Sequence, residues 1–96
     1  MNFLKTTDLD LQFGYYKYVR MKDNELRFCS FQDSHRSLVS EMEIQSGQIL
    51  SAGTIKIRNR KMKYDGYGSS TLNVNWNSSD DFLLTKTLGV KYDGDR

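Results

Sequence analysis

His35 is the only histidine in the chain, and a single histidine excludes a His-cluster metal site and a two-histidine proton relay. Asp33 or Ser34 can cap a helix directly before it, which would place His35 in the first turn, beside free N–H groups and the positive end of the helix dipole. That environment keeps an imidazole neutral, able to act as a base or nucleophile, and attracts anions. The alternative is a solvated polar residue near a helix start, since no partner of His35 is visible in the sequence.

A bend rich in glycine and hydroxyl groups runs from 65 to 71 with the sequence DGYGSST. Its two glycines let the backbone bend or approach a ligand closely. Free N–H groups and the hydroxyls of Ser69 and Thr71 can hold an anion such as phosphate. An ordinary connection is the alternative, because glycine and serine also mark plain turns. Lys17 stands on a strand among aromatic residues, where it either extends to the rim of the strand face or reaches into an anion pocket.

A basic hairpin is predicted over residues 54–64. If Asn59-Arg60 is a two-residue turn, apolar residues face apolar ones across the strand pair and basic residues face basic ones. Like charges opposite one another are unfavourable, unless solvent and salt or an anionic partner offsets the repulsion. Tyr64 and Tyr67 flank this hairpin and suit stacking on single-stranded nucleic acid. A solvated face is the alternative, because acidic neighbours reduce the net charge. The possible anion-binding residues are Lys56, Arg58, Lys61 and Lys63.

The elements that must position these residues are strands and two helices. Alternating or β-branched stretches predict strands over 8–13, 15–21, 26–31, 54–58, 61–64 and 72–76. Leu38, Val39 and Met42 form an apolar stripe that predicts a helix between Asp33 and Ser46. A second helix follows the Ser78–Asp81 cap signal, with Phe82, Leu83, Leu84 and Leu88 on its buried face and Gly89 at its end. We therefore predict an α+β domain over 1–96, with a mixed or antiparallel sheet of about five to six strands flanked by two helices.

Composition limits the function classes. The chain has 96 residues, a net charge of +2 and one cysteine, Cys29, which permits no internal disulfide and predicts a reduced, cytoplasmic protein. No apolar run approaches 18 residues, so no membrane association is expected. The sequence contains no P-loop, dinucleotide fingerprint, zinc motif or catalytically spaced carboxylate pair. We therefore expect no metal and no cofactor.

Four segments in a shared order resemble the Janus/Ocnus family of phosphohistidine phosphatase-like proteins, in particular its small bacterial-type members. They are DLDL with GYYKYV (8–11 and 14–19), SHRSLV (34–39), SAGTI (51–55) and YGSSTL (67–72). The resemblance implies the fold of that family and a metal-independent phosphatase or phosphoryl-binding protein. His35 would be its nucleophile or general base, and Lys17, Ser69 and Thr71 would hold the phosphate. A phosphorylated protein or a small phosphorylated ligand would be the partner.

The sequence departs from the family pattern at the phosphate-binding cation. The family has an arginine after its glycines, where this chain has Thr54, and a tyrosine where it has Ser34. Arg20 or Arg36 are the arginines that could take over the missing charge. The second hypothesis is therefore a non-catalytic binding module, which holds an anionic ligand, protein or nucleic acid through the same pocket or through the hairpin 54–64.

Overall fold

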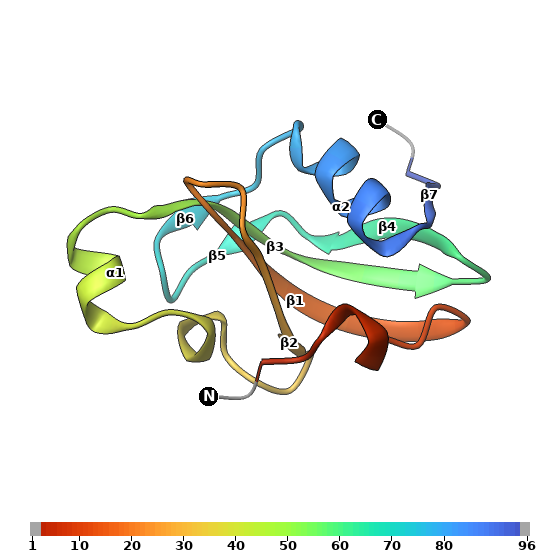
Figure 1. The fold of residues 1–96 in the computed structure, drawn as a ribbon, viewed down its shortest axis with the longest axis horizontal. Coiled ribbons are helices and arrows are strands. Elements are labelled where there is room, and N and C mark those ends of the chain that lie inside the picture. The colour runs from red at the N-terminus through yellow and green to blue at the C-terminus, as the bar shows by residue number, and fades with distance from the viewer. Residues whose placement is uncertain (1–2, 95–96) are drawn as a thin grey trace.

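The architecture is a five-stranded mixed sheet with a helix on one face and smaller elements on the other (Figure 1). A computed structural model describes residues 3–94. The strand order is β2-β1-β3-β4-β7, in which β7 runs parallel to β4 and the other pairs are antiparallel. The predicted α+β class is confirmed. The strands of this sheet are β1 (Phe13–Met21), β2 (Leu26–Ser30), β3 (Ile49–Arg58), β4 (Lys61–Gly66) and β7 (Lys91–Tyr92).

The remaining elements are short. β5 (Gly68–Ser69) and β6 (Val74–Asn75) form a separate two-stranded sheet. The helices are α1 (Glu41–Gln45) and α2 (Asp80–Leu88), and two 3₁₀ helices, η1 and η2, span Thr6–Asp8 and His35–Leu38. Figure 1 shows α1 at one end of the molecule and α2 over the sheet, beside β4 and β7.

The β3–β4 hairpin has the predicted register. Arg58 pairs with Lys61, Lys56 with Lys63, and Ile55 with Tyr64. The turn residues Asn59 and Arg60 have φ angles of 50° and 60°. Two successive positive φ angles define the type I′ turn, whose twist matches that of the flanking strands. The hairpin therefore carries its apolar residues on one face and its basic residues on the other.

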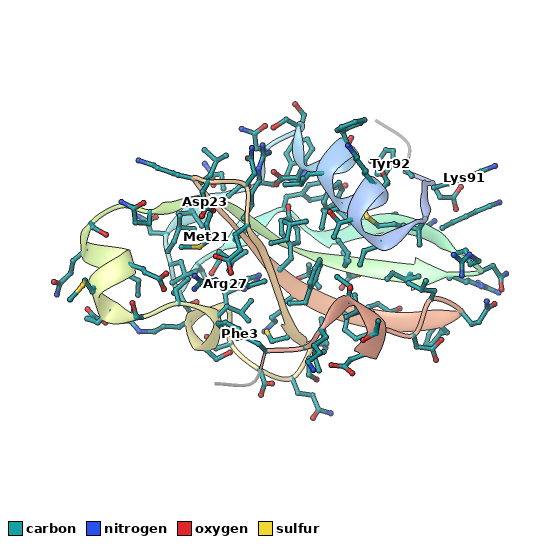
Figure 2. All side chains as sticks on the ribbon, viewed as in Figure 1. Phe3, Met21, Asp23, Arg27, Lys91 and Tyr92 are labelled. Carbon is teal, nitrogen blue, oxygen red and sulfur yellow. The ribbon has the colours of Figure 1, made fainter. Side chains whose placement is uncertain are left out.

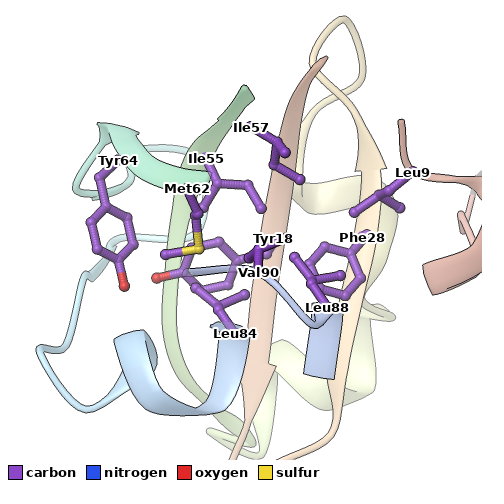
Figure 3. Close-up of a cluster of buried hydrophobic side chains, with 10 residues drawn as sticks. All are labelled: Leu9, Tyr18, Phe28, Ile55, Ile57, Met62, Tyr64, Leu84, Leu88 and Val90. Atoms are coloured by element: carbon purple, nitrogen blue, oxygen red, sulfur yellow. The ribbon is translucent and has the colours of Figure 1, made fainter. Parts of the chain in front are cut away.

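The apolar face of the sheet packs against α2. Figure 3 shows Ile55, Ile57 and Met62 facing Leu84 and Leu88 of the helix. Each such side chain contributes about 1.5–3 kcal/mol when it is fully buried. A second cluster on the opposite face covers only one end of the sheet, where residues of η2 and the β5–β6 connection pack on β1 and β3. Its buried members are Val19, Met21, Cys29, Leu38, Val39, Ala52 and Leu72.

The N-terminus of α2 is fixed to the sheet by the buried side chain of Asp80. Its carboxylate accepts hydrogen bonds from the Tyr18 hydroxyl at 2.5 Å and the Ser51 hydroxyl at 2.8 Å, and it pairs with Arg20 at 2.9 Å. A fully buried carboxylate needs such partners, because an uncompensated charge in the interior is costly. Burial and the neighbouring Asp80 carboxylate together raise the pKa of Tyr18. Asp80 thus holds the start of this helix on the sheet. The side-chain cap predicted at Ser78–Asp81 does not form, because the N-cap residue is Ser79 and its side chain makes no capping hydrogen bond.

Three sequence predictions of secondary structure were wrong in detail. Residues 8–13 form no strand up to Phe13, because the Asp10 carboxylate accepts hydrogen bonds from the N–H groups of Gln12 and Phe13 and bends the chain. The strand at 72–76 shrinks to β6, because Asn73 takes a positive φ of 55° in the preceding turn. Phe82 lies on the outer side of α2, 71% exposed, rather than on its buried face.

The helix predicted between Asp33 and Ser46 is divided into η2 and α1. Ser40 begins α1 with a capping box, in which its side chain accepts from the Glu43 N–H and the Glu43 carboxylate accepts from the Ser40 N–H. Met42 is therefore 77% exposed and does not belong to an apolar stripe. Arg27 of β2, labelled in Figure 2, holds Glu43 through two hydrogen bonds of 2.9 and 2.8 Å and so fastens α1 to the sheet.

Candidate functional site

One pocket brings together the four residues that the sequence proposed for phosphate chemistry. Lys17 comes from β1, His35 from the first position of η2, and Ser69 and Thr71 from the end of β5 and the turn after it. The pocket has a volume of about 270 Å³. Its lining is completed by Ser34, Gly68 and Ser70.

The orientation of His35 is fixed by a main-chain acceptor. The side chain is buried, 6% exposed, and its Nε2 lies 2.7 Å from the Gly53 carbonyl oxygen. A carbonyl can only accept, so Nε2 carries the hydrogen of the neutral ring and Nδ1 keeps its lone pair. Burial lowers the pKa of His35 and the charge of Lys17 lowers it further, while the bond to Gly53 acts in the opposite direction. The ring is thus held as a neutral base.

Burial, and not a helix dipole, keeps the histidine neutral. The sequence prediction placed His35 in the first turn of a longer helix, but η2 has four residues and a 3₁₀ hydrogen-bond pattern. Such a short element has little macrodipole. Ser34 does cap it, because its hydroxyl accepts from the Arg36 N–H at 3.1 Å. A neutral His35 is therefore still expected, but because its side chain is buried and not because of a helix dipole.

Gly53 is a glycine because two buried groups approach its Cα. A Cβ there would lie 2.9 Å from the Gly66 carbonyl oxygen and 2.9 Å from a ring carbon of Tyr18. Neither neighbour is the end of a flexible side chain. The close packing of β1, β3 and β4 at this point places the Gly53 carbonyl where His35 can donate to it.

The turn after β5 presents hydroxyl and N–H groups to the pocket. The Ser69 hydroxyl accepts from the Leu72 N–H at 3.2 Å and lies 3.1 Å from the Thr71 hydroxyl. Within residues 3–94, the backbone N–H groups of Ser70 and Thr71 donate to no protein acceptor. Gly68 allows the close approach of β6, since a Cβ there would meet the Val74 carbonyl oxygen at 2.8 Å. Groups of this kind favour an anion.

Among the described residues that line this pocket, Lys17 is the one with a cationic side chain. It is half-buried, and its Nζ lies 5.7 Å from the centre of the Phe31 ring. The two arginines considered as replacements for the cation missing at Thr54 are engaged elsewhere. Arg20 pairs with Asp80 at 2.9 Å and Arg36 with Glu41 at 2.5 Å, and neither lines the pocket.

The basic hairpin lies apart from this pocket. Its four cations line another hollow, of about 290 Å³, together with Asn59 and Asp93. The expected stacking role of Tyr64 was wrong: the side chain points to the opposite face of the hairpin and is only 8% exposed. Tyr67 is 54% exposed but packs its ring against Tyr64 and Trp76, away from the basic face.

Sequence reasoning missed three contributors to the pocket. Ser34 and Ser70 line it, and the Gly53 carbonyl orients the histidine. The adjacency of Ser34 to His35 and of Ser70 to Ser69 was the available signal for the first two. No sequence signal identifies the Gly53 carbonyl, because a main-chain partner depends on how the strands meet.

Comparison with protein-family models, with curated proteins and with solved structures finds no match to this chain. Among the described residues, no three His, Cys, Asp or Glu side chains gather in a metal-binding arrangement. None of the helices in residues 3–94 has the length and apolar character needed to cross a membrane.

Proposed function

We propose that this protein is a metal-independent phosphatase, or a phosphoryl-binding protein, of the phosphohistidine phosphatase type. The observation that carries the proposal is the neutral His35, whose Nε2 is bound to Gly53 while the ring lines one pocket with Lys17 and the hydroxyl turn. The phosphoryl group of a phosphorylated protein or small molecule would occupy this pocket. The resemblance of the four sequence segments supports the same assignment.

His35 Nδ1 can serve this chemistry in two ways. As a nucleophile it attacks phosphorus while the leaving group departs, and water then hydrolyses the phosphorylated imidazole. As a general base it takes a proton from the water that attacks phosphorus directly. Both need a neutral ring, and the lowered pKa of His35 supplies it at neutral pH.

Lys17 and the turn after β5 would stabilise the negative charge of the transferring phosphoryl group. Catalysis of phosphoryl transfer depends mainly on positioning and on electrostatic stabilisation of the equatorial oxygens. Lys17 supplies a full positive charge, and the N–H groups of Ser70 and Thr71, with the Ser69 hydroxyl, supply oriented dipoles. Thr54 adds no charge where the family has an arginine, so we expect weaker phosphate binding than in a site with two cations.

The test is hydrolysis of phosphoramidate and of phosphohistidine by the purified protein in the presence of a chelator. We expect turnover that falls by about 10²–10⁴-fold in His35→Ala, the range typical of a lost general base. Lys17→Met should weaken phosphate binding and turnover together. Lys22→Met, which removes an exposed lysine in the turn after β1, is the matched control and should leave both unchanged.

Two results would overturn the enzymatic proposal. One is absence of turnover by the unmutated protein with every phosphoryl substrate tried. The other is turnover that His35→Ala retains. If phosphate still protects the unmutated protein from thermal unfolding, and Lys17→Met loses that protection, the pocket is a phosphoryl-binding site without catalysis.

A further inference from the structure

The basic hairpin belongs to a larger uncovered face of the sheet. Strand pairing places Phe13 beside Arg58, Arg58 beside Lys61 and Lys61 beside Lys91, so these four residues form one row across β1, β3, β4 and β7. Directly paired residues share a face, and adjacent strands lie about 4.8 Å apart. Lys91, labelled in Figure 2, ends this row on β7.

A second row lies next to the first on the same face. Tyr15 pairs with Lys56, and Lys56 pairs with Lys63. Within residues 3–94, no carboxylate forms an ion pair with any cation of the two rows. Asp93 is the one acidic residue that lines the hollow among them. Their mutual repulsion is therefore left for solvent or an anionic partner to offset.

Aromatic rings form a strip along the edge of these cations. Phe13 and Tyr15 lie on β1, and Phe31, which follows β2, contacts Tyr15 with ring centres 5.7 Å apart. Phe13 is 55% and Phe31 48% exposed. Lys56 lies over the Tyr15 ring at 5.5 Å and Lys17 over the Phe31 ring at 5.7 Å. The face thus carries aromatic rings on β1 and beside β2, and cations on β3, β4 and β7.

We propose that this basic-aromatic face binds single-stranded nucleic acid. A single strand has bases on one side and phosphates on the other, which matches a strip of rings beside a strip of cations. Bases stack on exposed aromatic side chains with little sequence preference, and lysine and arginine bind the phosphates. An acidic polypeptide would use the cations but has no need of the rings, so the aromatic strip favours nucleic acid. The proposal does not depend on the chemistry of His35.

The experiment is fluorescence polarisation with labelled single-stranded DNA and RNA of about 12 nucleotides, within the range that one small domain covers. We expect binding that weakens with salt, with a slope in a log–log plot of about −0.7 for each phosphate contact. Lys56→Gln with Lys63→Gln should make this slope shallower by about 1.4. Phe13→Leu and Phe31→Leu keep an apolar group but remove stacking, and each should weaken binding by about 5-fold or more.

The far side of the molecule provides a matched control. Phe82 on α2 is 71% exposed, with Lys86 Nζ 5.6 Å from its ring centre, so it repeats the ring-and-lysine pair without the surrounding rows. Phe82→Leu and Lys86→Gln should leave binding unchanged. The proposal would be overturned if Phe82→Leu weakened binding as much as Phe13→Leu and Phe31→Leu do. It would also be overturned if no oligonucleotide bound, or if a polyglutamate peptide displaced the labelled strand as well as an unlabelled oligonucleotide does.

Discussion

Gly53→Ala is the substitution that best tests how the strand packing supports the site. The new Cβ would lie 2.9 Å from the Gly66 carbonyl oxygen and 2.9 Å from the Tyr18 ring. Tyr18 is fully buried, and its hydroxyl is bound to Asp80 at 2.5 Å, so the ring cannot move without weakening that bond. Overpacking typically costs about 1–3 kcal/mol. A charge-assisted hydrogen bond is worth about 1.5–3 kcal/mol, part of which is also lost.

We therefore expect Gly53→Ala to lower the free energy of unfolding by about 2–4 kcal/mol. For a domain of this size, such a loss corresponds to a decrease in Tm of about 10–25 °C. Urea denaturation measures the first quantity and thermal unfolding the second. Because the Gly53 carbonyl holds His35, the variant should also change the rate of phosphoramidate hydrolysis at temperatures where it is folded.

A double-variant cycle of Gly53→Ala with Tyr18→Phe distinguishes a steric clash with the Tyr18 ring from a general loss of stability. Without its hydroxyl, the ring is no longer held by Asp80 and can yield to the new methyl group. Gly53→Ala should then cost at least about 0.5 kcal/mol less in the Tyr18→Phe background. Gly47→Ala is the control, since Gly47 has a φ of +68° and open space within 4 Å of the place where a methyl group would lie. Its cost of about 1–2 kcal/mol is backbone strain and should not couple to Tyr18. An additive double variant of Gly53 and Tyr18 would refute the steric argument.

Four further outcomes test the electrostatics. Asp80→Ala leaves Arg20 and two buried hydroxyls without their acceptor, so we expect a loss of about 3–5 kcal/mol in urea denaturation. Hydrogen bonding to Arg27 lowers the pKa of Glu43 from 4.5 to about 2. As the pH falls through that interval, the wild type should lose about 1 kcal/mol of unfolding free energy after allowance for solvent screening. Glu43→Gln should not show this loss. Burial lowers the pKa of His35 below 6.5, so at acidic pH the unfolded chain binds more protons at this residue than the folded chain does. The free energy of unfolding of the wild type should therefore fall as the pH drops below about 6.5. His35→Asn should lack this contribution, and chemical denaturation across pH measures the difference. Lys17 also lowers that pKa, so Lys17→Met should move the acid limb of any kcat/KM profile to higher pH.

The part of the fold that could be predicted from the sequence is the part set by local pattern. Alternation over 54–58 and a two-residue turn at Asn59 and Arg60 are sufficient to define the β3–β4 register, because a slip by one residue would expose every apolar side chain. The first strand and the first helix were predicted wrongly where a side chain bonds to the backbone. Asp10 bends the chain before Phe13, and Ser40 starts a new helix after Val39.

The pocket residues were proposed from the chemistry of each residue in its own segment and from the resemblance of those segments to a family. Lys17, His35 and Ser69 lie far apart in the chain, and only the assembled sheet shows that they share a cavity. The basic-aromatic face was predicted in part: the four cations of its hairpin were identified, but Lys91 was not. Its rings were assigned to Tyr64 and Tyr67 in place of Phe13, Tyr15 and Phe31. The rings of Phe13 and Tyr15 lie beside the hairpin cations because β1 pairs with β3, and the sequence alone does not show which strand pairs with β3.

Lys17 belongs to both surfaces, because it lines the pocket with His35 while its Nζ lies over the ring of Phe31. An anion on the basic-aromatic face would offset part of the Lys17 charge that lowers the pKa of His35. The two proposals are nevertheless separable by residue. His35→Asn removes the base without touching the rings or the hairpin cations, and Phe13→Leu removes a stacking surface that lies outside the pocket. If both proposals hold, only Lys17→Met weakens phosphoryl chemistry and oligonucleotide binding together.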